Sequence, residues 1–221
     1  MADLDGPRIA PRSGNAKQLV VFLHGYGADG NDLIDIGRAW AGLMPDAAFV
    51  SPHAPRPCGQ APMGREWFPL TFRDPHERWT GVNAAEPVLN AFLDAELARR
   101  QLPPQALALV GFSQGTMMAL HVGLRRTTPP AAIVGYSGML VVPEELDPAQ
   151  FAAEIKAKPP VLLVHGDQDP LIPVQALFAA AQGLAALDIP AEWHVSPGIG
   201  HGIDQEGLRQ GGEFLARQFA R

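Results

Sequence analysis

Short apolar runs alternate with stretches of helical spacing along most of the chain. The run Q-L-V-V-F-L at 18–23 is rich in β-branched and aromatic residues, as a buried strand is. The segment 32–43 instead repeats apolar residues every three or four positions and stops just before Pro45, which is typical of a helix. The same patterns predict strands at 18–23, 47–50, 107–110, 132–135, 161–164 and 191–195, and helices at 32–43, 84–101, 114–125, 174–187 and 205–220. Strands separated by helices predict an α/β fold, with a mostly parallel central sheet and helices on both faces.

Two segments lack this alternation. Residues 51–83 carry six prolines and no sustained period, which predicts a long irregular excursion. The large apolar side chains within it indicate an ordered segment rather than a solvated linker. Residues 140–158 form either a small flap or a surface crossover, so we expect a small or absent lid. No internal repeat or long polar linker divides the chain, and we therefore expect one domain over 1–221.

Composition excludes several classes of protein. With 221 residues, 47% hydrophobic and 18% charged, the chain is neither a coiled coil nor a disordered tail. Its net charge of −6 and the lack of a Lys/Arg cluster argue against a nucleic-acid partner. No run approaches the roughly 18 apolar residues of a membrane span, so we expect no stable membrane insertion. Cys58 is the single cysteine, which excludes an internal disulfide and favours a cytoplasmic protein.

The motif G-F-S-Q-G at 111–115 carries the clearest chemical signal. It follows the predicted strand 107–110 and precedes the predicted helix 114–125, which is the context of a nucleophile elbow. The serine of such an elbow sits on a turn so tight that only glycine fits two residues to either side. The motif therefore predicts that Ser113 is a nucleophile.

A serine needs a base and an orienting carboxylate, and in this fold they follow in the order Ser, Asp, His. The turn after strand 161–164 supplies two carboxylates, Asp167 and Asp169, and the residues alone leave the choice between them open. His201 lies in a glycine-rich loop before the last helix, whereas His194 lies inside a strand pattern and fits a structural role. Both turns lie at carboxyl ends of strands, where sites form in α/β sheets.

The motif H-G-Y-G at 24–27 has two interpretations. Gly25, Gly27 and Gly30 satisfy the G-x-G-x-x-G pattern of a dinucleotide site, but the acidic residue expected after the second strand is missing. In a hydrolase, this loop instead supplies a backbone N–H to an oxyanion hole, together with the residue after the nucleophile. Leu23 or its neighbour and Gln114 would be those donors.

Several motifs together resemble the phospholipase/carboxylesterase branch of the α/β-hydrolases, which includes acyl-protein thioesterases and bacterial carboxylesterases. These motifs include G-F-S-Q-G and H-G-Y-G. The others are P-H-A-P at 52–55, R-E-W-F at 65–68, H-G-D-Q-D-P-L-I-P at 165–173 and G-I-G-H at 198–201. The resemblance runs from about Val20 to the C-terminus. It implies an α/β-hydrolase fold with a triad of Ser113, Asp169 and His201, and backbone donors at Leu23 and Gln114. Pro69 and Thr116 depart from the family pattern, which has Asp and often Gly there, and both departures concern substrate preference.

The resulting hypothesis is a serine hydrolase that cleaves short- to medium-chain acyl esters through an acyl-enzyme. Acyl-protein thioesterase or lysophospholipase activity is the alternative, and a non-catalytic binding module or a nucleotide-binding oxidoreductase is the remote one. We expect no cofactor and, because no histidine pair has ligand spacing, no metal. Relatives of this type often form homodimers. Candidate substrate-binding residues are Met63, Trp67, Phe68, Met139, Leu171 and Ile172.

Overall fold

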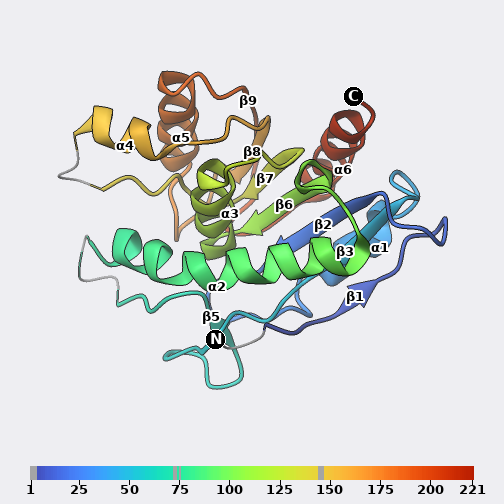
Figure 1. The fold of residues 1–221 in the computed structure, drawn as a ribbon. Coiled ribbons are helices and arrows are strands. Elements are labelled where there is room, and N and C mark those ends of the chain that lie inside the picture. The colour runs from blue at the N-terminus through green and yellow to red at the C-terminus, as the bar shows by residue number, and fades with distance from the viewer. Residues whose placement is uncertain (1–3, 72–73, 75, 144–146) are drawn as a thin grey trace.

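A seven-stranded sheet forms the centre of the molecule (Figure 1). The computed structural model describes residues 4–71, 74, 76–143 and 147–221. The strand order is β1-β3-β2-β6-β7-β8-β9. The bounds are β1 Arg8–Ile9, β2 Gln18–Leu23, β3 Ala47–Val50, β6 Leu107–Phe112, β7 Ala132–Tyr136, β8 Val161–Gly166 and β9 Ala191–Ser196. Only β1 pairs antiparallel among these strands, so the prediction of a mostly parallel sheet is confirmed.

Helices cover both faces of this sheet, as the alternation predicted (Figure 1). Successive strand residues point to opposite faces of the sheet. Leu109 of β6 therefore belongs to a first hydrophobic core, and Val110 belongs to a second core on the other face. Helices α2, α3 and α5 pack on the first core, and α1 and α6 pack on the second. The helices are α1 Ile34–Trp40, α2 Glu77–Arg100, η1 Pro104–Ala106, α3 Gln114–Arg125, α4 Pro148–Glu154, α5 Gln175–Ala186 and α6 Gln205–Phe219. No helix in the described part of the chain is long and apolar enough to cross a membrane.

The parallel register brings the carboxyl ends of five strands to one edge of the sheet. Leu23 of β2 lies opposite Gly111, and the end of β7 lies beside the end of β8. Gly166 lies opposite Ser196, so β9 ends at the same level as β8. The turns that follow these strands are therefore neighbours, although up to 180 residues separate them in sequence.

The long segment 51–83 is more regular than the sequence predicted. It contains a short hairpin of β4 (Arg56–Pro57) and β5 (Arg65–Glu66), and α2 begins at Glu77 rather than at residue 84. The early start follows from tertiary packing, because Val82 is fully buried against the first core. The prediction of an irregular chain up to residue 83 was wrong for its last seven residues, because the density of nearby prolines obscured the helix.

The segment 140–158 contains α4, and three of its residues, 144–146, lie outside the described part. Phe151 is buried, and its ring lies 6.1 Å from the ring of Trp79 on α2. Arg125 of α3 pairs with Glu154 at 2.7 Å and lies over the Trp79 ring at 5.3 Å. Helix α4 is thus held against α2 and α3 by apolar and charged contacts.

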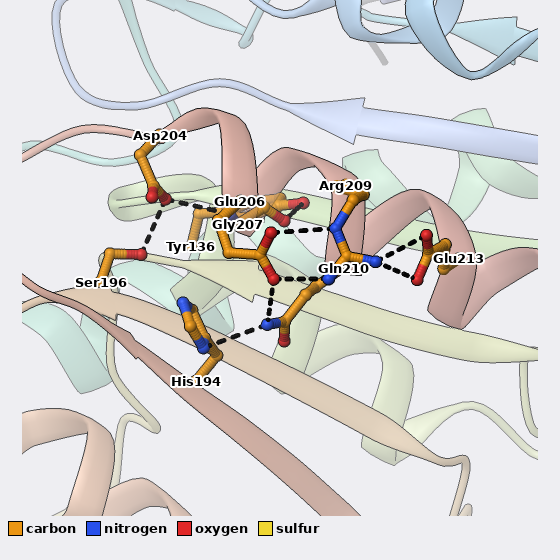
Figure 2. A network of polar contacts seen from close by, with 9 residues as sticks. All are labelled: Tyr136, His194, Ser196, Asp204, Glu206, Gly207, Arg209, Gln210 and Glu213. Carbon is orange, nitrogen blue, oxygen red and sulfur yellow. Dashed lines mark hydrogen bonds and ion pairs between the residues drawn. The ribbon is translucent and has the colours of Figure 1, made fainter.

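Helix α6 is anchored to β7 and to α1 by two buried polar side chains. The Tyr136 hydroxyl donates to the Gly207 carbonyl at 3.1 Å, and the Trp40 indole donates to the Leu208 carbonyl at 3.0 Å. Figure 2 shows Tyr136 next to Gly207 at the start of α6. These bonds hold the amino-terminal turn of α6 in place.

Replacing Tyr136 by Phe keeps the buried ring and removes the hydroxyl donor. Because the Gly207 carbonyl then loses a buried partner, we expect the free energy of unfolding to fall by about 1 kcal/mol. Urea denaturation followed by circular dichroism measures this change. An unchanged midpoint would contradict the role of this bond as an anchor of α6.

Candidate active site

Ser113 occupies a strained turn between β6 and α3. Its backbone angles are φ 55° and ψ −115°, which a residue with a side chain rarely adopts. A Cβ on Gly115 would lie 1.8 Å from the Leu23 carbonyl oxygen, and one on Gly111 would lie 2.4 Å from the Gly115 backbone. The Ser113 N–H is also fixed, since it donates to the Tyr136 carbonyl at 2.9 Å. These contacts explain why glycine flanks the serine on both sides, as the elbow motif predicted.

Asp169 lies in the turn after β8 with its carboxylate fully buried. One oxygen accepts the backbone N–H groups of Leu171 and Ile172, both at 2.9 Å, and the other lies 2.7 Å from Nδ1 of His201. Burial alone would raise the pKa of Asp169, but the Ile172 amide, His201 and the Leu171 amide outweigh it and hold the pKa below the usual value. The carboxylate is therefore ionised beside the imidazole.

The contact with Asp169 determines the tautomer of His201. An ionised carboxylate only accepts hydrogen bonds, so Nδ1 carries the proton and Nε2 of the neutral ring has a free lone pair. The ring lies 5.0 Å from the ring of Phe112, the residue before Ser113. The imidazole thus lies beside the elbow, with its acceptor nitrogen available as a base.

The loop that carries His201 is held at its base by polar contacts (Figure 2). Asp204 caps α6 by accepting the Gly207 N–H at 3.0 Å, and the same oxygen accepts the Ser196 hydroxyl at 2.7 Å. Ser196 ends β9 and Asp204 precedes α6, so this bond joins the two ends of the loop. His201 therefore lies on a loop whose two ends are held together by a hydrogen bond.

The alternative residues have structural contacts instead. Asp167 is exposed and accepts the Gly198 N–H at 2.6 Å, which ties the turn after β8 to the loop after β9. His194 on β9 accepts from the Gln210 side chain of α6 at 3.1 Å (Figure 2). The structure therefore brings Asp169, rather than Asp167, to His201.

His24 anchors the loop after β2. Its Nδ1 donates to the Gly25 carbonyl at 2.8 Å, and its Nε2 accepts the Ala54 N–H at 3.0 Å. Burial lowers the pKa of His24 to about 4, so the ring is neutral. A Cβ on Gly25 would lie 3.4 Å from the Ser113 Cβ, so the turn that begins at Gly25 lies directly against the serine. Leu23, the predicted donor, lies within β2 and has no exposed surface.

Gln114 links the elbow to the segment after β5. As the first residue of α3, its backbone N–H has no acceptor within the helix. Its buried side chain accepts the Trp67 N–H at 2.9 Å and donates to the Phe68 carbonyl at 2.8 Å. The Trp67 indole in turn donates to the His24 carbonyl at 3.0 Å. A chain of buried hydrogen bonds thus runs from the elbow to the loop after β2.

The predicted substrate-binding residues do not form one group. Trp67 and Phe68 are almost fully buried and line a cavity of about 590 Å³ against the start of α2. Met63 is 93% exposed in the hairpin loop, on a different hollow that Gly27 also lines. Met139 lines a third cavity, between α2 and α5.

Leu171 and Ile172 lie beside Asp169, and their environments differ. Leu171 is 71% exposed, whereas Ile172 is buried. The amides of both residues bind the Asp169 carboxylate. Of these two side chains, only that of Leu171 is therefore accessible to a ligand.

The two departures from the family pattern also differ in position. Thr116 is buried and donates to the Tyr136 carbonyl at 2.8 Å, and Gly135 and Gly138 leave the space that its side chain fills. Pro69 is exposed and lines the cavity of about 590 Å³. Thr116 therefore affects packing inside the protein, whereas Pro69 lies where a ligand could contact it.

Sequence reasoning missed the side chain of His165. Its Nε2 lies 2.8 Å from the Ile172 carbonyl and 3.2 Å from the Asp169 carboxylate. Both partners are acceptors, so Nε2 carries a proton and donates toward the same oxygen that His201 binds. A buried polar residue in an apolar strand, four positions before the aspartate, is the signal that points to it.

The parallel sheet, the strained serine between β6 and α3, and the histidine–aspartate pair after β8 and β9 define an α/β-hydrolase. The chain matches the family model described as Phospholipase/Carboxylesterase over residues 4–218. It belongs to this family, and it is a hydrolase that acts on esters.

Named relatives agree with this class. The chain is 26% identical to acyl-protein thioesterase 1 of Gibberella zeae, over 96% of this chain and 95% of that protein. It is 27% identical to esterase YpfH of Escherichia coli, over 88% of this chain and 80% of that protein. Among solved structures, esterase PE8 superposes with a TM-score of 0.92 at 47% identity, over 98% of this chain and 99% of that one.

The buried, neutral His24 makes stability depend on pH. Its pKa is about 4 in the folded protein and about 6.5 when unfolded, so the unfolded state binds more protons between these values. We expect the free energy of unfolding to fall below pH 6.5 and to keep falling until pH 4, at about 1.4 kcal/mol per unit from this group. Urea titrations at several pH values measure the slope.

Two variants isolate the contribution of His24. His24→Gln should reduce the slope without removing it, because burial also lowers the pKa of His121, to about 3, and this group contributes to the slope as well. His76→Gln, which removes an exposed imidazole, should leave the slope unchanged. Equal slopes in all three proteins would show that His24 is not the titrating group.

Proposed function

We propose that the protein is a serine carboxylesterase that hydrolyses short- to medium-chain acyl esters, with Ser113, Asp169 and His201 as its triad. The observation that carries the proposal is the strained conformation of Ser113 in an elbow beside a histidine bound to a buried aspartate. Structural serines rarely need a left-handed backbone, whereas an elbow nucleophile does.

The chemistry follows from the protonation states. Nε2 of His201 takes the proton of the Ser113 hydroxyl while the oxygen attacks the ester carbonyl, and Asp169 stabilises the imidazolium. His201 then gives this proton to the leaving alcohol, which leaves an acyl group on Ser113. Water, deprotonated by the same nitrogen, attacks the acyl-enzyme, and His201 returns this proton to the Ser113 oxygen as the bond to the acyl group breaks and the acid is released.

Two backbone amides stabilise the oxyanion in this proposal. The first is the N–H of Gln114, which has no acceptor within α3. For the second we propose an amide of the turn that begins at Gly25, in place of Leu23, because Gly25 lies against Ser113 and Leu23 lies inside the sheet.

Thioester hydrolysis is the second candidate activity, and the similarity to acyl-protein thioesterase 1 favours it. Values of kcat/KM for matched esters and thioesters over an acyl-chain series distinguish the two. A lysophospholipid of the same chain length, included in the series, tests the third alternative.

We also propose a cytoplasmic location and a homodimer. The buried, free Cys58 suits a reducing compartment. Analytical ultracentrifugation tests the dimer, and a single species at monomer mass would contradict it.

Removing the nucleophile tests the proposed function directly. A fluorophosphonate probe should label the wild-type protein once, and Ser113→Ala should abolish both labelling and ester hydrolysis. Labelling that survives in Ser113→Ala would contradict the proposal. Thermal unfolding of the variant checks that the fold is intact, because replacing Ser113 removes only a hydroxyl group from the strained turn.

The Trp67 indole holds the loop after β2, which contributes to the proposed oxyanion hole, and two matched variants test this role. Trp67→Phe and Trp40→Phe each remove one buried indole donor to a backbone carbonyl. We expect each to lower the free energy of unfolding by about 1 kcal/mol. Only Trp67→Phe should lower kcat, about tenfold, because it releases the loop after β2. Equal kcat values in the two variants would contradict a role for Trp67 in positioning that loop.

A further inference from the structure

A cavity of about 370 Å³ lies between the start of α2, residues 139–143 and α5. Trp79, Leu140, Val141 and Ala180 contribute to its mainly apolar wall. Its lining begins at Met139, directly after Gly138, where a Cβ would lie 2.9 Å from the Ser113 carbonyl oxygen. The segment that forms one wall of the cavity therefore begins next to the residue that packs against the elbow, and the cavity itself lies between the start of α2 and α5.

Arg78 also lines this cavity, and its charge has no partner there. Its Nε is inaccessible to solvent and has no hydrogen-bond acceptor, and no ion pair joins Arg78 to any residue that the structure describes. The nearby Arg125 shows the contrast, because it is paired with Glu154 at 2.7 Å. A buried guanidinium nitrogen without an acceptor is unfavourable, and the apolar wall supplies none.

The net charge of the protein is −6, so its overall charge does not attract anions. The attraction is local, from one guanidinium whose planar donors match a carboxylate or a phosphate. A ligand that fills the cavity would have an apolar stem against Trp79 and Leu140 and an anionic end at Arg78.

We propose that this cavity is a substrate subsite and that Arg78 selects esters with an anionic group, a carboxylate or a phosphate, at the end of an apolar arm. The inference rests on the proposed ester hydrolysis at Ser113. Arg78 is here a specificity-determining residue, and it takes no part in the bond changes at the ester.

Pairs of esters that differ only in the terminal charge test the subsite. On the acyl arm, 4-nitrophenyl hydrogen adipate is compared with 4-nitrophenyl hexanoate. On the alcohol arm, 6-acetoxyhexanoate is compared with hexyl acetate. We expect kcat/KM to be about tenfold higher for the charged ester in one of the two arms, which also identifies the arm that enters the cavity.

Variants of Arg78 separate its charge from the shape of the cavity. Arg78→Gln should abolish the preference, so that kcat/KM for the charged ester falls about tenfold, to the value for the neutral ester. Arg78→Lys, which keeps a charge without the planar fork, should restore part of the preference. Arg12→Gln makes the same change of charge at an exposed position after β1, at the far edge of the sheet from α5, and should keep the full preference.

The outcomes distinguish this inference from the proposed function. If the neutral esters are hydrolysed but neither charged ester is preferred, or if Arg78→Gln retains the preference, the subsite is ruled out while the esterase stands. If no ester is hydrolysed and Ser113 is not labelled by the fluorophosphonate, the proposed function itself fails. Thermal unfolding of each variant confirms that the compared proteins are folded.

Discussion

The contact between the Gly115 backbone and the Leu23 carbonyl is the constraint on which the arrangement of the site depends. No side chain fits at this contact, since a Cβ would lie 1.8 Å from the oxygen. It lets the first turn of α3 approach the end of β2, and the chain between β6 and α3 must then pass through a left-handed residue, Ser113. The strain at the serine is thus a consequence of close packing between a helix and a neighbouring strand.

That packing also determines what surrounds the serine. Because β2 and β6 end at the same level, the turn at Gly25 lies against Phe112 and Ser113. Buried polar side chains then hold the neighbouring loops, with Gln114 and Trp67 on one side and Asp169 on the other. Gln114 and Asp169 each make two or more hydrogen bonds and the Trp67 indole makes the one that its N–H allows, so burial of these polar groups rigidifies the edge of the sheet instead of destabilising it.

The polar network around Asp169 explains how the His201 imidazole keeps an acceptor nitrogen. Two backbone amides and two imidazole nitrogens surround the carboxylate, which keeps it ionised although it is buried. The loop of His201 is independently closed by Asp204 and Ser196. The orientation of the imidazole therefore depends on contacts from both of its flanking elements, and not on the single bond to Asp169.

Periodicity was enough to predict six of the seven strands and most helices, because these depend on local alternation of apolar residues, whereas β1 at Arg8–Ile9 is too short to show a pattern. The strand at 18–23 and the helix at 114–125 have the bounds that their patterns predicted. The start of α2 could not be found this way, since it depends on burial of Val82 against distant residues. The residues alone left the choice between Asp167 and Asp169 open, and only the family resemblance implied Asp169. The fold supplies the physical reason, because both lie in one turn and only Asp169 faces His201.

The same difference between local pattern and tertiary contact separates the elbow motif from the cavities that would bind a substrate. Glycines at fixed spacing indicate the elbow because backbone sterics allow no other residue there, so a motif of five residues is enough to predict the strained turn at Ser113. The cavities are built where the segments 51–76 and 139–143, which show no period, meet helices α2 and α5 after folding. Their walls are apolar and tolerate exchange of one residue for another, so no spacing records what they bind. A charged side chain among them, such as Arg78, is informative because an apolar wall gives it no partner of its own.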